Sequence, residues 1–130
     1  MIGSSAFNYI NVLDRAADAS WLRNSVISNN IANADTPNYK RKDVQFESFL
    51  MEAVAGGASL DDNVANVDLD GINPMTYVDG AGYSYRMDGN NVDIDTENAE
   101  LAKNQLKYYV ELDSITQEFN RLKAVTKTAG

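Results

Sequence analysis

The side chains that could do chemistry in this sequence are mostly carboxylates. Between residues 60 and 98 there are nine acidic residues and one basic residue, Arg86. Paired carboxylates can supply the acid and the base of glycoside hydrolysis, and loops rich in Asp and Asn can ligate calcium. The chain of 130 residues has no cysteine and no histidine, which removes thiol chemistry and the commonest general base. Any catalysis would therefore depend on carboxylates, hydroxyls, lysines and tyrosines.

These carboxylates do not form a recognisable catalytic or metal-binding pattern. They show no fixed constellation and lie in the segment with the weakest periodicity, so we predict that the protein is not an enzyme and has no catalytic residue, metal site, cofactor or small-molecule substrate. Residues 68–71 and 88–93 hint at calcium loops, but their glycines are misplaced and the terminal glutamate of an EF-hand is missing. Turn formation is the simpler interpretation, and a secreted calcium-binding interaction protein remains the weaker alternative.

The composition sets further limits. A net charge of −8 argues against nucleic-acid binding, which normally requires a basic face. The length fits a single domain, residues 1–130, and 44% hydrophobic residues argue against a wholly disordered chain. No apolar run approaches the roughly 18 residues of a membrane span. No basic residue precedes the first apolar positions, so we do not expect a cleaved secretory signal.

Two long amphipathic helices are predicted, over residues 5–32 and 95–127. In each, apolar or small residues recur at alternating spacings of three and four, which is typical of helices that pack along one seam. The second helix begins with Asp95, which suits an N-cap. The predicted fold class is mainly α, with the two terminal helices in an antiparallel coiled-coil-like pair, a loop-rich middle and a small β-hairpin. The predicted seam residues are Ile10, Leu13, Ala17, Trp21, Asn24, Ile27 and Ile31 on the first helix and Leu101, Tyr108, Leu112, Ile115, Phe119 and Leu122 on the second.

The middle of the chain has weaker signals. Pro37 cannot continue a helix and favours an extended Thr36, so residues 33–51 should start with a loop. Phe46, Phe49 and Leu50 share a helical face, which favours a short helix later in that segment. Residues 52–82 are rich in glycine without a sustained period, which predicts a flexible loop. Alternation over residues 83–94 around Asp, Gly and Asn predicts the β-hairpin.

Both predicted helices carry apolar residues outside the seam. Two interpretations are open: these residues pack against the hairpin or the segment around Phe46 and Phe49, or they pack against identical or related neighbours. A contact of the second kind, repeated by rotation, builds a filament. The extra apolar residues are Phe7, Trp21 and Val26 on the first helix and Leu106, Tyr109 and Val110 on the second.

Residues 28–40, SNNIANADTPNYK, resemble a motif near the N-terminus of flagellar rod and hook proteins. Residues 41–47 and a second block, residues 85–95 continuing into 100–105, are similar to the proximal-rod member of the flagellar basal-body rod protein family. Asn38 stands where many relatives have glycine, and Asn also reaches positive φ. The residues that carry the motif are Asn29, Asn30, Ile31, Ala32, Asn33, Thr36, Pro37, Tyr39 and Lys40.

The resemblance implies a structural subunit of the bacterial flagellar basal body, part of the torque-transmitting shaft around the export channel. Such proteins polymerise helically through their terminal helices and are exported without a cleaved leader. The implied partners are the protein itself, other rod subunits, the rod–membrane-ring junction protein and the flagellar export gate at the rod base. The implied location is the rod, on the periplasmic side where an outer membrane exists. Another axial rod or adaptor subunit is the main alternative.

The basic cluster Lys40, Arg41 and Lys42 has two interpretations. It can pair with the acidic middle of a neighbouring subunit, or it can be a solvated run of charge. Single surface ion pairs contribute little to stability, so the sequence does not decide between them.

Overall fold

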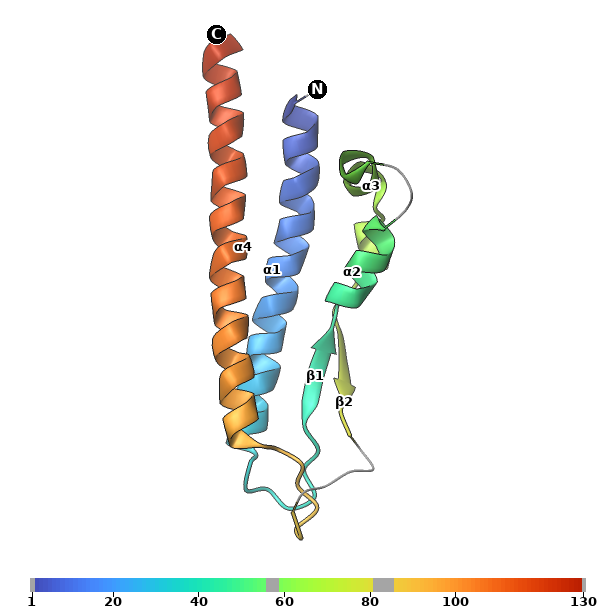
Figure 1. Ribbon diagram of the computed structural model, residues 1–130, viewed down its shortest axis with the longest axis vertical. Coiled ribbons are helices and arrows are strands. Elements are labelled where there is room, and N and C mark those ends of the chain that lie inside the picture. The colour runs from blue at the N-terminus through green and yellow to red at the C-terminus, as the bar shows by residue number, and fades with distance from the viewer. Residues whose placement is uncertain (1, 56–58, 81–85, 130) are drawn as a thin grey trace.

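The computed structural model describes residues 2–55, 59–80 and 86–129. Two long helices dominate it: α1 (Ile2–Ala32) and α4 (Ile94–Ala129), which returns beside α1. The helices are antiparallel, so both termini lie at one end (Figure 1). This pair confirms the predicted fold class, and the two helices begin and end within three residues of the predicted bounds. None of the described helices has the length and hydrophobicity of a membrane span.

The start of α4 is fixed by a capping residue two positions before the predicted one. The Asp93 carboxylate accepts hydrogen bonds from the N–H of Asp95 at 3.1 Å and of Thr96 at 3.4 Å. It also accepts from the Thr96 hydroxyl at 3.1 Å. Asp93 therefore satisfies the free amides of the first turn, while Asp95 and Glu97 lie inside that turn, where negative charge is favourable.

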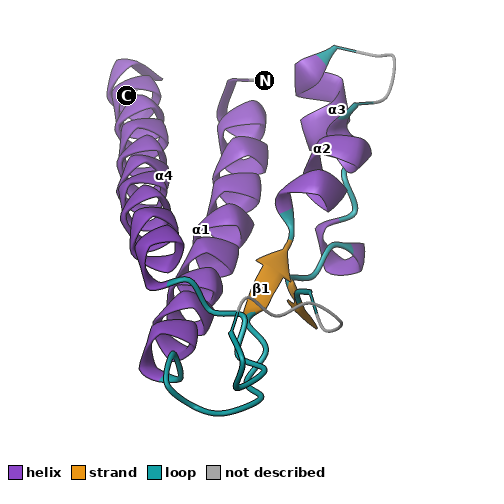
Figure 2. Cartoon of the chain, turned by 60° about the horizontal axis from the view of Figure 1, so that its bottom comes forward, coloured by secondary structure: helices purple, strands orange, loops and turns teal. Residues whose placement is uncertain are grey.

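The elements between the long helices form an arm along α1. We use the name arm for the described residues from 42 to 80. Figures 1 and 2 show the arm on the side of α1 that faces away from α4, so α1 lies in the middle of the molecule. The elements of the arm are β1 (Lys42–Gln45), α2 (Glu47–Val54), α3 (Leu60–Asn66), the short 3-10 helix η1 (Leu69–Gly71) and β2 (Met75–Val78).

The arm is more ordered than the predicted loop. The short helix expected near Phe46 is α2, but α3, η1 and β2 lie within the segment 52–82 that was expected to be irregular. The two-stranded antiparallel element is also present, built from other residues than predicted. It pairs β1 with β2, Lys42 opposite Val78 and Gln45 opposite Met75.

The predicted hairpin over residues 83–94 does not form in the described part of that segment. Residues 83–85 lie outside the described residues, residues 86–93 form turns and irregular backbone, and Ile94 already belongs to α4. The physical reason is that residues 88–91 use their backbone and side-chain groups to bind the turn after α1, as described below.

The arm packs on α1 through a small apolar cluster. Phe46 and Ile72 are buried against Ala19 of α1, and Ala16, Phe49, Leu50 and Val67 pack around them. The small side chains of Ala16 and Ala19 let the arm approach the helix closely. Burial of this kind contributes about 25 cal/mol per Å² of apolar surface, so the cluster holds the arm to the helix pair.

Candidate functional site

The first part of the candidate site is the turn that follows α1. The N–H of Asn33 donates to the carbonyls of Asn29 and Asn30 at 3.1 and 3.2 Å, and the Asn33 side chain donates to the Asn29 carbonyl at 2.8 Å. The N–H of Thr36 then donates to the Asn33 carbonyl at 3.1 Å. Asn38 has a φ of 62°, a left-handed conformation that Asn tolerates. The motif therefore satisfies the free carbonyls at the helix end and reverses the chain.

A second segment of the chain closes over this turn. Asn90 is completely buried, and its Nδ2 donates to the carbonyls of Asn33 and Thr36, each at 2.9 Å. The N–H of Asn38 donates to the Asp88 carbonyl at 2.8 Å. The two sequence blocks that carry the family resemblance thus contact each other. We use the name junction for the unit they form, residues 29–42 with residues 86–91.

Gly89 allows the two halves of the junction to meet. Its φ is 81°, and a Cβ at this position would lie 2.4 Å from the Oδ1 of Asn38, so the close approach requires glycine. Two basic side chains add bonds across the same contact. The Lys40 ammonium donates to the Gly89 carbonyl, and the Arg86 guanidinium donates to the Ala34 carbonyl.

Asn30 connects the junction to α4 and to the arm. Its side chain is completely buried. Nδ2 donates to the Lys42 carbonyl at 2.7 Å and to the Glu97 carboxylate at 3.1 Å. Oδ1 accepts from the Lys42 N–H at 2.9 Å and from the Tyr39 hydroxyl at 3.1 Å. The amide uses both donors and both acceptor positions. This motif residue is therefore a buried polar side chain whose hydrogen bonds are all satisfied, and we refer to it and its partners as the polar core.

Ion pairs surround this polar core. The Arg41 guanidinium pairs with Glu97 and with Asp79, and it reaches Asp43 at 3.2 Å. Arg23 of α1 forms a bidentate ion pair with the Asp43 carboxylate: its Nε donates to Oδ1 at 2.7 Å and its Nη2 to Oδ2 at 3.2 Å. Arg41 of the basic cluster therefore pairs within its own chain, so it is not part of a solvated run of charge. The pairing joins α1, the arm and the first turn of α4.

The same contacts shift the titration of the buried groups. Burial alone would raise the pKa of Asp43, but hydrogen bonds from Arg23 and from the Val44 N–H, together with Arg41, hold that pKa below its usual value. Burial disfavours the charged form of Arg41, yet the hydrogen bond and charge of Glu97 raise its pKa above the ordinary range. The charged pairs are therefore the stable protonation state at neutral pH.

The second part of the candidate site is the seam between α1 and α4, which only partly matches the predicted one. Three predicted residues, Trp21, Leu112 and Phe119, are 60%, 39% and 46% exposed and so lie outside the closed part of the seam. Ile10, Ala17 and Ile27 are buried. The remaining predicted seam residues are half-buried: Leu13, Asn24, Ile31, Leu101, Tyr108, Ile115 and Leu122.

Polar residues occupy the seam where apolar ones were expected. Ser20, Asn104 and Glu111 are all buried. Asn104 Nδ2 donates to the Ser20 carbonyl at 2.7 Å, and the Ser20 hydroxyl donates to Glu111 at 3.1 Å. A spacing signal could have found the α4 members, because positions 101, 104, 108 and 111 alternate three and four apart. Positions 104 and 111 are the polar residues Asn and Glu, so a pattern of apolar residues does not include them.

Glu111 is only half satisfied in this seam. Burial raises its pKa, and the Ser20 hydrogen bond and the charge of Lys107 offset part of that rise. Its second carboxylate oxygen is buried and has no hydrogen-bond partner among the residues that the structure describes. Lys107 lies 4.0 Å from Glu111 and also pairs with Glu47 of α2. Burial lowers the pKa of Lys107, and Glu111 opposes that shift.

The third part of the candidate site is the exposed apolar surface of the helix pair. The rings of Trp21 and Tyr108 pack across the seam with centroids 5.6 Å apart, and Tyr109 extends this aromatic group at 6.2 Å from Tyr108. Much of the surface is open to solvent, with Tyr109 and Leu106 each 67% exposed. We use the name apolar surface for its exposed members: Phe7, Trp21, Leu106, Tyr109, Val110, Leu112 and Phe119.

Within the described residues, the arm does not cover this surface. Phe46 and Phe49, in the segment proposed as an internal cover, instead pack in the cluster with Ala16 and Ala19 of α1. Of the six extra apolar residues, only Val26 is half-buried, and the other five stay exposed. An uncovered apolar surface of this extent is typical of a protein–protein contact. The sequence-based alternative of internal packing is therefore wrong for these five.

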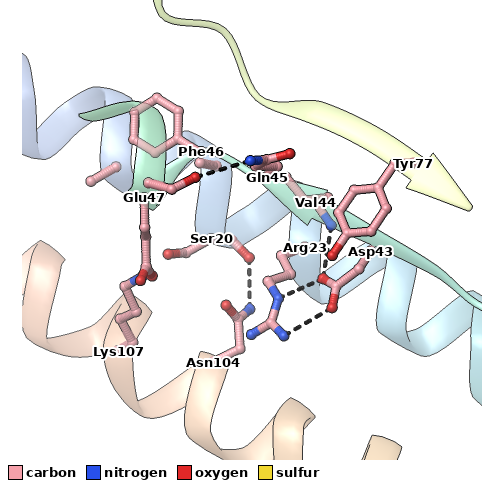
Figure 3. Close-up of a pocket in the computed structure, with 13 residues that line it drawn as sticks. Ser20, Arg23, Asp43, Val44, Gln45, Phe46, Glu47, Tyr77, Asn104 and Lys107 are labelled. Carbon is pink, nitrogen blue, oxygen red and sulfur yellow. Dashed lines mark hydrogen bonds and ion pairs between the residues drawn. The ribbon is translucent and has the colours of Figure 1, made fainter. Parts of the chain in front are cut away.

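A pocket of about 550 Å³ lies between α4, α1 and the arm, and Figure 3 shows the residues that line it. The small residues Ala16 and Ala19 of α1 are part of its lining. Its charged groups are paired: Arg23 with Asp43, and Lys107 with Glu47. A carboxylate held by a cation is a poor general base.

The acidic loops considered as calcium sites use their carboxylates for local structure. Asp68 caps η1, and its side chain accepts from the Gly71 N–H at 3.3 Å. Asp88 accepts from the Asn90 N–H at 3.0 Å, inside the junction. Among the described residues, no group of three acidic side chains is arranged to hold a metal ion. Turn formation accounts for these residues.

Comparison with known proteins gives a consistent result. Residues 10–40 match the family described as flagella basal body rod protein. The chain is 38% identical to the flagellar basal body rod protein FlgB of Bacillus subtilis, over 87% of this chain and 88% of that protein. It is 36% identical to FlgB of Borreliella burgdorferi, over 87% of this chain and 91% of the relative. It is 30% identical to FlgB of Escherichia coli, over 82% and 83%.

Proposed function

This chain belongs to the family of flagellar basal body rod proteins, and from that premise we propose that it is a structural subunit of the proximal part of the rod. The observation that carries the proposal is the similarity to FlgB proteins over most of the length of both chains. The structure supports it physically. The residues that resemble the family form the junction, which holds the two long helices side by side and leaves their apolar surface free.

The apolar surface is the contact between neighbouring subunits. A lone pair of helices buries one seam, and the remaining exposed apolar side chains gain free energy only when another chain covers them. A contact between this surface and a different face of the next subunit is heterologous, and repeated by rotation it builds a helical tube. The seam residues hold each subunit together, and the exposed residues join it to others.

The same membership supports the partners and the location that the sequence suggested. The chain assembles with itself and with other rod subunits in the flagellar basal body. At the rod base it meets the export gate and the rod–membrane-ring junction protein. It reaches this place without a cleaved leader, on the periplasmic side in an envelope with an outer membrane. Its role is mechanical, and it catalyses no reaction.

Deletion of the gene, followed by complementation and electron microscopy of isolated basal bodies, tests this function. We expect the deletion strain to be non-motile and to lack a rod, and the restored strain to carry the chain in density at the rod base. Density for the chain in the distal rod would favour another axial subunit. Motile deletion cells with intact rods would refute the proposal.

A pair of variants tests the apolar surface as the subunit contact. Tyr109→Ser removes a ring that is 67% exposed, so the monomer should fold normally while rod assembly fails. The matched control is Met51→Ser on α2, where the side chain is 68% exposed but lies in the arm. Motility should be lost in the first strain and kept in the second. Equal motility in both strains would contradict this contact.

A further inference from the structure

The strand β2 has one paired edge and one open edge. The sheet contains only β1 and β2 among the described residues. All four residues of β2 are exposed, including the apolar side chains of Met75 at 56%, Tyr77 at 41% and Val78 at 49%. An exposed apolar edge strand is a template for pairing with another chain.

The register identifies the backbone groups at the open edge. The N–H of Asp79 donates to the Arg41 carbonyl at 2.8 Å, so these two residues face each other as a hydrogen-bonded pair. Such pairs alternate with non-bonded ones in an antiparallel ladder. Val78 and Thr76, which lie opposite Lys42 and Val44, therefore direct their N–H and C=O groups away from β1.

The outward backbone groups of β1 and β2 differ in whether they are hydrogen-bonded. The outward N–H and C=O of Lys42 on β1 are both bonded to the Asn30 side chain, which closes that edge against another strand. On β2, no hydrogen bond within the described part of the chain occupies the outward groups of Thr76 and Val78. The strand itself, Met75–Val78, contains none of the lysines, prolines or charges that usually protect an edge.

The charge of the arm indicates what kind of segment could pair there. The arm, residues 42–80, contains eight acidic residues and one basic residue, Lys42. Four of the eight are in ion pairs with Arg15, Arg23, Arg41 or Lys107. The other four, Glu52, Asp61, Asp62 and Asp68, are exposed. A second copy that paired edge to edge would bring two acidic arms together, whereas a basic segment would be attracted.

We propose that the open edge of β2 binds an extended basic segment of a partner protein by β-strand addition. The partner's backbone bonds to Thr76 and Val78, and its apolar side chains cover Met75, Tyr77 and Val78. Its lysines or arginines face the acidic arm. This contact lies on the arm and is separate from the apolar surface of the helix pair, so it does not depend on the proposed mode of rod assembly.

Amide hydrogen exchange measured on the full chain by NMR tests the proposal. The probe is a synthetic peptide of alternating valine and threonine with two lysines at each end. Without peptide, the amides of Thr76 and Val78 should exchange fast, and those of Tyr77 and Asp79 slowly. Saturating peptide should slow Thr76 and Val78 by about tenfold or more. No slowing, or equal binding of a peptide with glutamates in place of the lysines, would overturn the proposal.

A proline substitution isolates the backbone contact. Thr76→Pro removes an N–H that points away from β1, and an edge strand tolerates proline at such a position. We expect peptide affinity to fall by about tenfold, the loss of one hydrogen bond, while Thr76→Ala should bind like the unmodified chain. Unchanged affinity in Thr76→Pro would refute strand addition. If that variant does not fold, the exchange pattern of the unmodified chain decides.

The same peptide distinguishes this proposal from the proposed function. Tyr109→Ser lies on the apolar surface and should bind the peptide normally even when it cannot assemble. Failure of peptide binding in the folded, unmodified chain would remove the edge contact and leave the rod function standing. If the Tyr109→Ser variant binds the peptide, that result supports the contact at the edge of β2. If the same variant also swims normally, that result contradicts the proposed contact through the apolar surface.

Discussion

The side chain of Asn30 binds the backbone of Lys42 as a neighbouring strand would. Its Nδ2 donates to the Lys42 carbonyl at 2.7 Å, and its Oδ1 accepts from the Lys42 N–H at 2.9 Å. Asn30 belongs to α1 and Lys42 to β1, so one amide joins the helix pair to the arm. The family motif therefore has a structural role within the subunit, because it sets where the arm lies relative to the helices.

The first prediction concerns this amide. Asn30→Ala removes four hydrogen bonds and leaves the Lys42 backbone and Glu97 without their partner, so we expect the free energy of unfolding to fall by about 3 kcal/mol. Urea unfolding followed by circular dichroism measures the change. Asn29→Ala, at the exposed neighbouring position of the motif, is the control and should change stability by less than about 0.5 kcal/mol. Equal effects of the two substitutions would contradict the role of Asn30.

The second prediction uses the contact between Gly89 and Asn38. Gly89→Ala places a Cβ 2.4 Å from the Asn38 Oδ1 at a φ of 81°, so we expect a loss of about 1–3 kcal/mol. Asn38→Gly alone should be nearly neutral, because glycine also adopts the left-handed conformation of residue 38. In the double variant the clash disappears and only the backbone strain remains. A thermodynamic cycle that shows additive effects would argue against the contact.

The long helices could be predicted from the sequence because their periodicity repeats over many turns. On α1 the spacing includes the buried residues Ile10, Ala17 and Ile27, but it also includes Trp21, which is 60% exposed. On α4 a pattern of apolar residues alone favours Leu112 and Phe119 for the seam, whereas Asn104 and Glu111 are buried there. Burial of these polar residues depends on partners such as Ser20 on the other helix, which a local pattern does not contain.

The arm and the junction depend on contacts between distant residues. The strands of the arm have four residues each, which is too short for a clear alternation of apolar and polar residues. In addition, β1 pairs with β2 across about thirty residues of chain. The family resemblance identified two blocks, but Asn90 meets Asn33 across 57 positions. That distance explains why residues 86–93 were predicted as part of a hairpin. Their partner is the turn after α1, not the neighbouring segment.

The third prediction compares a buried and an exposed ion pair. Asp43→Asn weakens the contact with Arg23 and Arg41, whose side chains are largely buried, and should cost about 2 kcal/mol at neutral pH. Because the folded pKa of Asp43 lies below its unfolded value, its stabilisation is complete above about pH 5 and is lost as the pH falls further. The two proteins should therefore converge in acid, which urea unfolding across pH would show.

The control for this prediction is Asp70→Asn. Asp70 pairs with Arg15 at 3.0 Å, but its side chain is 96% exposed, so solvent screens the pair and little stability should be lost. A loss as large as that of Asp43→Asn, or a difference between Asp43→Asn and the unmodified chain that persists in acid, would show that the buried pair does not have the assigned role.

The fourth prediction concerns Glu111, whose contribution to stability changes with pH in the opposite direction to that of Asp43. The folded pKa of Glu111 is raised, chiefly by burial, so the folded state binds this proton more tightly than the unfolded state does. Stability from this group therefore falls as the pH rises from the unfolded pKa through the folded one. Glu111→Gln removes that loss, and its stability relative to the unmodified chain should increase as the pH rises above the ordinary pKa of a glutamate, about 4.3. A pH-independent difference would contradict the assignment.

The last prediction separates folding from assembly. Ile27 is completely buried in the seam, so Ile27→Ala leaves a cavity and should cost about 3 kcal/mol in the monomer. Trp21→Ala should cost much less, because the ring is 60% exposed and packs against the ring of Tyr108. It should nevertheless abolish motility, because a neighbour covers that ring in the rod. Unfolding of the purified chains and swimming of the strains measure the two effects. If Trp21→Ala destabilises the monomer as much as Ile27→Ala does, the ring belongs to the subunit core; if the strain swims normally, the ring is not part of the contact.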